Sequence, residues 1–114
     1  MQYLLLIYDR EVRWTKLSTA EQNSETQEYG AFGKEFAKSI RGGNALQPTP
    51  TAKTVRVRNA KPQVTDGPFA ETKEQLGGYY LVEAGDEAEA IAIAAKIPWA
   101  RHGSIEIRPI LTFS

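Results

Sequence analysis

The stretch DGPFAETKEQLGGYY, residues 66–80, combines a turn, a dense group of charged side chains and the start of a strand. The Asp-Gly-Pro triplet at 66–68 is typical of a turn, because Asp caps its own backbone, Gly accepts unusual φ values and Pro fixes the next φ. The glycine pair at 77–78 lets other backbone segments approach closely. The charged side chains between these features therefore lie in a short loop that leads into a tyrosine-rich strand, a setting in which functional residues are common.

Outward from this loop, hydrophobic periodicity and capping patterns predict strands alternating with two helices. The expected strands are 3–8, 44–47, 54–58, 63–65, 77–84 and 104–108. One helix begins at the capping box of Ser18 with Glu21 and is expected to end at the glycines 42–43. The second begins at Asp86 and ends at Pro98. This order, βαββαβ with an extra hairpin strand, predicts an α+β fold of the ferredoxin-like, split βαβ type.

The apolar positions of these elements indicate which surfaces are buried. Tyr29, Phe32, Phe36 and Ile40 form one stripe on the first helix, while its first half is almost wholly polar. Both helices would cover one face of the sheet with such stripes. Tyrosine and leucine side chains of the first and fourth main strands would then be exposed on the other face. We therefore expect a homodimer that packs sheet to sheet.

Composition limits the function further. The chain has 114 residues, enough for one small core, and its 14 basic and 14 acidic side chains give no net charge. No global field favours nucleic acid or an anionic membrane, so neither is an expected partner. The absence of cysteine fits a reducing, cytoplasmic setting. The apolar start, residues 1–8, is too short for a membrane span and lacks the features of a signal peptide.

The candidate site lies in a pocket expected between the sheet and the loop at 66–75. Asp66 or Glu71 would accept a proton there, while Lys73, Arg108 or a tyrosine would stabilise negative charge. The alternative is that Glu71 and Lys73 form a structural ion pair that fastens the loop. Together with these catalytic candidates, Asp66, Glu71 and Lys73, the expected substrate-binding residues are Tyr8, Phe69, Glu74, Tyr79 and Arg108.

Other residues carry weaker signals. His102 has no partner at a triad or metal-ligand spacing, so we expect an exposed loop residue and no metal or other cofactor. Arg56 and Arg58 share one strand face, which fits a solvated surface better than an anion or nucleic-acid site. Trp14 and Trp99 are expected to fill the core or an interface rather than to support a cofactor.

Residues 66–80 resemble the signature of the DGPF-domain branch of the YCII-related proteins. The segments 3–8, 54–58, 97–101 and 106–109 resemble that branch as well, so the resemblance spans nearly the whole chain. It implies a single domain at 1–114, a dimeric α–β barrel fold and a bacterial, cytoplasmic protein. Some relatives in the wider superfamily are small-molecule enzymes, including a dehydrochlorinase of aromatic degradation, and others are encoded beside, or fused to, extracytoplasmic-function sigma factors.

The resemblance does not transfer a catalytic pair. YCII enzymes are described as using a histidine and an aspartate, with the histidine near the first helix, whereas the only histidine here is His102. Two hypotheses follow. One is a cofactor-independent enzyme that acts on a small, aromatic or carbonyl-containing metabolite by acid/base chemistry. The other is a non-catalytic ligand-binding or protein-interaction module associated with a sigma factor.

Overall fold

The computed structural model describes residues 1–113 and contains two separate antiparallel sheets. The main sheet has the strand order β2-β5-β1-β6, and the second consists of β3 and β4 alone. The strands are β1 (Gln2–Asp9), β2 (Ile40–Ala45), β3 (Lys53–Arg58), β4 (Lys61–Asp66), β5 (Gln75–Glu83) and β6 (Ser104–Pro109). The helices are α1 (Glu11–Lys16), α2 (Thr19–Glu35) and α3 (Glu87–Ala95), with short 3₁₀ turns η1 (Thr49–Thr51) and η2 (Pro98–Arg101).

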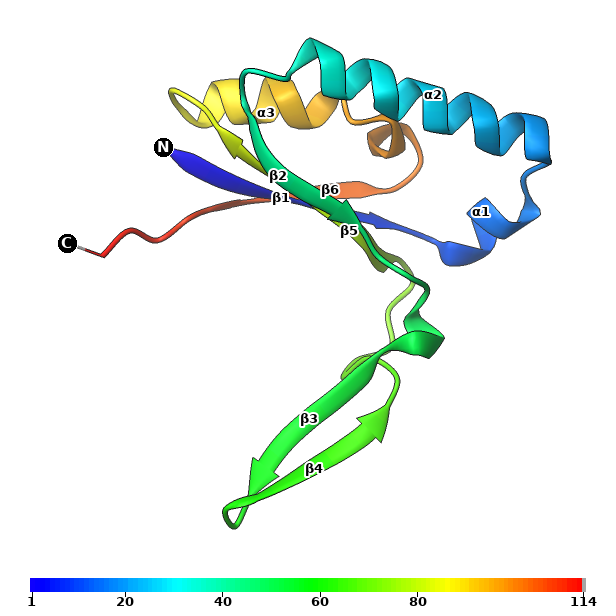
Figure 1. Ribbon diagram of the computed structural model, residues 1–114, viewed down its shortest axis with the longest axis vertical. Helices are drawn as coiled ribbons and strands as arrows, with labels where there is room; N and C mark the ends of the chain where they lie inside the picture. Colours follow the sequence, from blue (N-terminus) through cyan, green and yellow to red (C-terminus); the bar gives the residue numbers. More distant parts are fainter. Residues whose placement is uncertain (114) are drawn as a thin grey trace.

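The arrangement confirms the ferredoxin-like prediction. Helices α2 and α3 cover one face of the main sheet, and the β3–β4 hairpin projects away from the opposite side (Figure 1). β1 pairs in antiparallel fashion with both β5 and β6, so it lies in the centre of the sheet. The fold is that of a subunit of the dimeric α–β barrel type.

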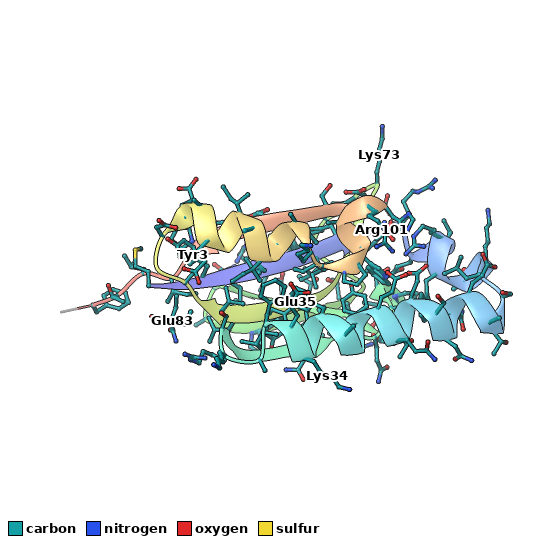
Figure 2. The ribbon with its side chains drawn as sticks, turned by 90° about the horizontal axis from the view of Figure 1, so that it is seen from above. Tyr3, Lys34, Glu35, Lys73, Glu83 and Arg101 are labelled. Atoms are coloured by element: carbon teal, nitrogen blue, oxygen red, sulfur yellow. The ribbon has the colours of Figure 1, made fainter. Side chains whose placement is uncertain are left out.

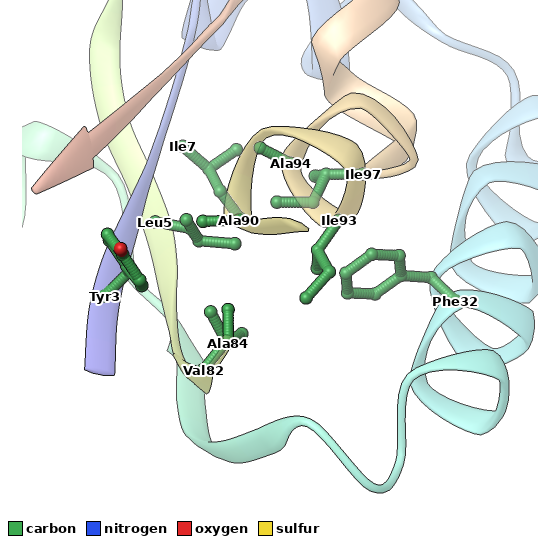
Figure 3. Close-up of a cluster of buried hydrophobic side chains, with 10 residues drawn as sticks. All are labelled: Tyr3, Leu5, Ile7, Phe32, Val82, Ala84, Ala90, Ile93, Ala94 and Ile97. Atoms are coloured by element: carbon green, nitrogen blue, oxygen red, sulfur yellow. The ribbon is translucent and has the colours of Figure 1, made fainter. Parts of the chain in front are cut away.

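The core lies between the sheet and its two helices. Alternate residues of β1 point into it, with Leu5 fully buried opposite Tyr80 of β5. In the same buried cluster, Ile93 from α3 lies beside Phe32 from α2 (Figure 3). Full burial of one such aliphatic side chain contributes about 2 kcal/mol. This packing holds β1, which ends at Asp9, and the Asp9 carboxylate accepts from Arg13 of α1.

The predicted end of the first helix is wrong. α2 ends at Glu35, and the glycines 42–43 lie inside β2 without positive φ. β2 must begin at Ile40 to pair with Val82, and its backbone approaches β5 so closely that a Cβ on Gly43 would lie 2.7 Å from the Tyr79 carbonyl oxygen. Glycine therefore serves strand contact here, not helix termination. The expected strand at 44–47 is correspondingly displaced toward the N-terminus.

The short helix α1, which carries Trp14, is not among the elements predicted from the sequence.

The hairpin β3–β4 confirms both predicted strands at 54–58 and 63–65, with the valines of β3 on one face. It does not join the main sheet. Its turn places Asn59 and Ala60 at φ values of 51° and 62°. At its base, the Thr54 hydroxyl donates to the Gly67 carbonyl oxygen at 2.8 Å.

No helix within residues 1–113 is both long and apolar enough to cross a membrane.

Candidate functional site

A cavity of about 780 Å³ opens between α1, the first half of α2 and the ends of β2 and β5. Its aromatic lining comes from separate elements: Trp14, Tyr29, Tyr79, Tyr80 and Trp99. Asp9 and Glu11 supply carboxylates, and Asn44, Gln47 and Gln75 supply amides. An apolar concave site with a few polar groups is the usual form of a small-molecule site.

Two glycines of the opening stretch shape one wall of this cavity. A Cβ on Gly77 would lie 2.9 Å from Cζ3 of Trp99, and one on Gly78 would lie 2.8 Å from the Asn44 carbonyl oxygen. The missing side chains therefore allow the Trp99 ring to rest on β5 and allow β2 to pair closely. Trp14 packs against Trp99 with ring centroids 6.0 Å apart.

Arg13 joins two buried carboxylates at the inner end of the cavity. Its Nε donates to Asp9 Oδ2 at 2.5 Å, and its two terminal nitrogens donate to the two oxygens of Glu25, each at 2.9 Å. Trp99 Nε1 also donates to Glu25, at 2.9 Å. The guanidinium lies 5.5 Å from the Trp99 ring centroid, within range of a cation–π interaction.

The charges in this cluster stabilise each other. The Arg13 hydrogen bond holds the pKa of Glu25 below its usual range, against a smaller opposing effect of burial. The hydrogen bond to Glu25 in turn raises the pKa of Arg13. The Asp9 carboxylate is only 2% exposed, and its other oxygen accepts from the Arg10 backbone N–H at 2.7 Å. The cluster thus holds two carboxylates against one guanidinium.

Glu11 fastens the cavity rim. Its carboxylate accepts from the Thr49 backbone N–H at 2.7 Å and from the Thr49 hydroxyl at 2.9 Å. Its own backbone N–H donates to the Gln75 side-chain oxygen at 3.0 Å. These bonds connect α1 with η1 and with the start of β5. They come from neutral donors, so the negative charge of Glu11 is not neutralised by them.

Two tyrosines in the cavity are well suited to donate hydrogen bonds. Burial raises the pKa of both Tyr29 and Tyr80. Their hydroxyls therefore keep their protons at neutral pH and can donate to a carbonyl oxygen or an oxyanion. No Lys, Arg or His is among the described residues that line the cavity.

The residues predicted as catalytic lie outside this cavity. Asp66 is exposed at the base of the hairpin, where it forms an ion pair with Lys53. Glu71 and Lys73 are also exposed, and Lys73 points away from the body of the molecule (Figure 2). Among residues 1–113, no ion pair joins Glu71 to Lys73, so the alternative of a structural pair is not supported.

The residues predicted to bind substrate are dispersed. Tyr79 lines the cavity, and its hydroxyl accepts from the Asn44 side-chain amide at 2.9 Å. Tyr8 pairs with Leu76 and Ser104 in the sheet, while Glu74 accepts from the Ser104 hydroxyl at 2.7 Å. Phe69 is 81% exposed, and Arg108 is exposed beside Glu106. Of the loop at 66–75, Gln75 alone is among the residues lining the cavity.

The sequence patterns did not indicate as site residues the cavity-lining Asp9, Glu11 and Tyr29, or the adjacent pair Arg13 and Glu25. Two signals were available. An aspartate at the end of a buried strand with an arginine four residues later suggests an ion pair. The polar first half of α2, which carries Glu25 and Thr26, also indicates a face that borders a polar site rather than a core.

Within residues 1–113, no three His, Cys, Asp or Glu side chains are grouped to hold a metal ion. The expectation that the protein uses no cofactor stays a prediction.

Comparison with known proteins gives the family. The sequence model of the YCII-related domain matches residues 1–114. The chain belongs to the YCII-related family. An uncharacterized protein of Rhizobium meliloti (strain 1021) is 33% identical to this YCII-related protein over 117 residues, covering 99% of this chain and 94% of the relative. The resemblance of residues 66–80 to the YCII-related proteins is confirmed at the level of the family.

A solved structure shares the fold. It is the 5-chloro-2-hydroxyhydroquinone dehydrochlorinase of Burkholderia phenoliruptrix AC1100 in complex with 2,5-dihydroxybenzoquinone, with a TM-score of 0.60 and 12% identity. The match covers 97% of the YCII-related protein and 94% of the dehydrochlorinase. At this identity the likeness establishes the fold alone.

Proposed function

We propose that this YCII-related protein binds a small aromatic or carbonyl-containing metabolite, neutral or positively charged, and acts on it by proton transfer without a cofactor. The observation that carries the proposal is the cavity of about 780 Å³, with aromatic side chains and carboxylates but no basic side chain among its described lining residues. That volume is in the range of ordinary small-molecule sites, roughly 300–1,000 Å³.

The aromatic lining supports a planar ligand. Trp99 packs against both Trp14 and Tyr29, with the Tyr29 and Trp99 rings nearly perpendicular and their centroids 6.2 Å apart. Rings fixed in this way lose little conformational entropy when a second ring stacks on them. The solved structure of the same fold contains a bound benzoquinone, which is consistent with a ligand of this shape.

The charge of the lining supports a neutral or cationic ligand. Asp9 and Glu11 both face the cavity, and Arg13 must balance Glu25 as well as Asp9. A carboxylate or phosphate on the ligand would meet uncompensated negative charge in a partly desolvated site. An ammonium group would find both the carboxylates and the faces of the aromatic rings.

Proton transfer needs a donor and an acceptor, and the cavity supplies both kinds of group. Tyr29 or Tyr80 would donate a hydrogen bond to a ligand carbonyl, which stabilises the negative charge that develops on its oxygen. Asp9 is the carboxylate placed to receive a proton from the ligand. The roles expected for Asp66, Glu71 and Lys73 stay predictions, and they require the exposed loop to contact the ligand.

A second candidate is ligand binding without catalysis. It is favoured by the fact that Asp9 and Glu11 already accept two hydrogen bonds each, so neither is a free base. The association with a sigma factor belongs to this candidate and stays a prediction.

Binding is tested with three probes of matched shape: benzylamine, benzyl alcohol and benzoate. We expect titration calorimetry to give affinities in that order, with benzoate at least roughly tenfold weaker than the alcohol. Glu11→Gln, which keeps one of the two oxygens that accept from Thr49, should reduce the preference for the amine. Tighter binding of benzoate than of the amine would contradict the proposed ligand class.

The position of the site is tested by variants. Tyr29→Phe and Trp99→Leu remove groups of the cavity, whereas Asp66→Asn and Glu71→Gln change the loop. If the cavity is the site, only the first pair weakens binding. If only the loop variants lose binding, the site lies at the loop.

Catalysis is tested separately in deuterium oxide. For a carbonyl-containing ligand found by thermal shift, an enzyme of this type exchanges an acidic carbon-bound proton, which NMR detects as loss of that signal. Asp9→Asn should slow the exchange at least roughly 100-fold. Binding without exchange would favour the non-catalytic candidate.

We also propose a homodimer. Leu4, Leu6 and Leu81 alternate along β1 and β5 with the buried side chains, so they lie on the sheet face opposite α2 and α3, and each is only partly buried. A second sheet packed there would remove this apolar surface from water. The bacterial and cytoplasmic setting expected from the resemblance stays a prediction.

A further inference from the structure

We infer that the β3–β4 hairpin is an arm that packs against the body of a second copy of this chain. The inference goes beyond the proposed function and does not depend on what the cavity binds.

The first observation is an exposed apolar face on the hairpin. Cross-strand pairing places Val55 beside Val64 and Val57 beside Pro62, so these four side chains share one face. The three valines are 60%, 60% and 61% exposed. The other face carries Arg56, Arg58 and Lys61 with polar neighbours. A hairpin with one apolar and one charged face is expected to pack its apolar face against another protein surface.

The second observation is that the hairpin has no support within its own subunit. β3 and β4 pair only with each other, and the pair projects from the main sheet (Figure 1). An isolated two-stranded hairpin is marginally stable in water, because too little apolar surface is buried to offset the ordering of its backbone. A stable hairpin in this position therefore needs a further surface.

The third observation is the size of the exposed surface. The chain exposes 8116 Å², whereas a compact monomer of 12.7 kDa exposes about 6,200 Å². Its radius of gyration is 16.2 Å, compared with about 13 Å for a compact chain of this length. Part of the excess belongs to the extended residues 110–113. The remaining excess area is comparable to the area that each chain of an obligate homodimer buries, roughly 1,000–2,500 Å².

Charge identifies a second copy as the partner. Residues 53–66 contain four basic side chains and one acidic one, for a net charge of +3. The whole chain is neutral, so the remaining residues carry a net charge of −3. Arg56, Arg58 and Lys61 lie on the face opposite the valines, so their charge acts at long range: it favours the approach of the arm of one copy to the body of another, and a single twofold axis relates two such contacts.

Hydrogen exchange distinguishes an arm contact from a dimer formed by the sheets alone. Mass spectrometry at high protein concentration should show protection of amides in residues 53–66, and this protection should decrease as dilution releases monomers. Light scattering on the same samples reports the mass. A dimer whose hairpin amides exchange equally fast at all concentrations would overturn the inference. A monomer of 12.7 kDa at a protein concentration of about 100 μM would overturn it as well.

A substitution pair makes the test specific. Val55→Asp with Val64→Asp places charges on the apolar face and should raise the dissociation constant at least roughly 100-fold, because each copy contributes both sites. Ile91→Asp is the matched control, since Ile91 is an exposed aliphatic residue on α3, far from the hairpin in sequence. Equal dissociation constants for the two variants would overturn the inference. Hairpin protection that appears only after addition of RNA or anionic lipid vesicles would overturn it as well.

Discussion

Arg13 is hydrogen-bonded to Asp9, which lines the cavity, and to Glu25 behind it, so its removal leaves both buried carboxylates without their cation. Arg13→Met keeps most of the side-chain volume and should lower the free energy of unfolding by about 3 kcal/mol. Urea denaturation at pH 7 measures this loss. Arg10→Met is a suitable control, because Arg10 is exposed and three residues away. A loss no greater than that of the control would contradict the role assigned to the cluster.

Glu25 gives the cluster a defined pH dependence. Its pKa is lowered in the folded state from the unperturbed value of 4.5, chiefly by the Arg13 hydrogen bond. A lowered pKa stabilises the fold above the unfolded-state pKa, and this stabilisation is lost as the pH falls through the folded-state pKa. The stability difference between wild type and Glu25→Gln should therefore be constant from pH 7 to about 5 and should decrease below pH 4.5. A difference that does not vary down to about pH 3 would argue against a charged Glu25.

Charge density along the sequence does not mark this cavity. Dense charge in the loop drew attention to Asp66, Glu71 and Lys73, all of which are exposed. Charges cluster where water solvates them, so density alone does not indicate a site. Asp9 and Glu25 are informative for the opposite reason, because a buried carboxylate requires a partner. Burial of this kind is decided by the tertiary structure and is weakly encoded in local sequence.

Residues 66–80 reach the cavity through the first half of β5. Gly77→Ala would place a Cβ 2.9 Å from Trp99 Cζ3 and displace the ring from the strand. We expect a stability loss of about 1–3 kcal/mol and weaker binding of the amine probe. Trp fluorescence would report the displaced ring directly. Gly30→Ala is the control, since a Cβ there meets no atom within 4 Å.

The turn of the hairpin contains a local strain that can be relieved. Ala60 adopts a φ of 62°, in the left-handed region that favours glycine, and Asn59 precedes it at 51°. Asn-Gly is the preferred pair for such a turn. Ala60→Gly should therefore stabilise the hairpin by about 1 kcal/mol, less the entropic cost of glycine in the unfolded chain. Slower amide exchange in residues 61–66 would show the effect, and faster exchange would contradict it.

Elements with strong periodicity were predictable, and those governed by strand pairing were not. The unbroken apolar run at 3–8 and the capping box of Ser18 with Glu21 predicted a strand and a helix start that the structure confirms. The end of α2 was missed, because Ile40 fits the helical stripe as well as it fits β2. Pairing with Val82 decides between the two, and a long-range contact of this kind is not visible in a local pattern.

For the whole molecule, the order of the elements was enough to predict the ferredoxin-like sheet, because few topologies accommodate two helices with single apolar stripes. The separate position of the hairpin was not predicted. Its valines alternate as in any half-buried strand, so the sequence shows that one face is apolar but not what it contacts. The body of a second copy of this chain is the surface that net charge and exposed area favour.

The proposed dimer makes thermal stability depend on the protein concentration and on the salt concentration. Dissociation and unfolding are linked in a dimer, so the melting temperature of the wild type should rise as the protein concentration is increased from about 1 to 100 μM. Added NaCl should lower it at a fixed concentration, because salt screens the attraction between the +3 arm and the −3 body. Val55→Asp with Val64→Asp should remove the concentration dependence, while Ile91→Asp should retain it. A melting temperature that is the same at every concentration and salt level would show that the native unit is the single chain, with its hairpin free in solution.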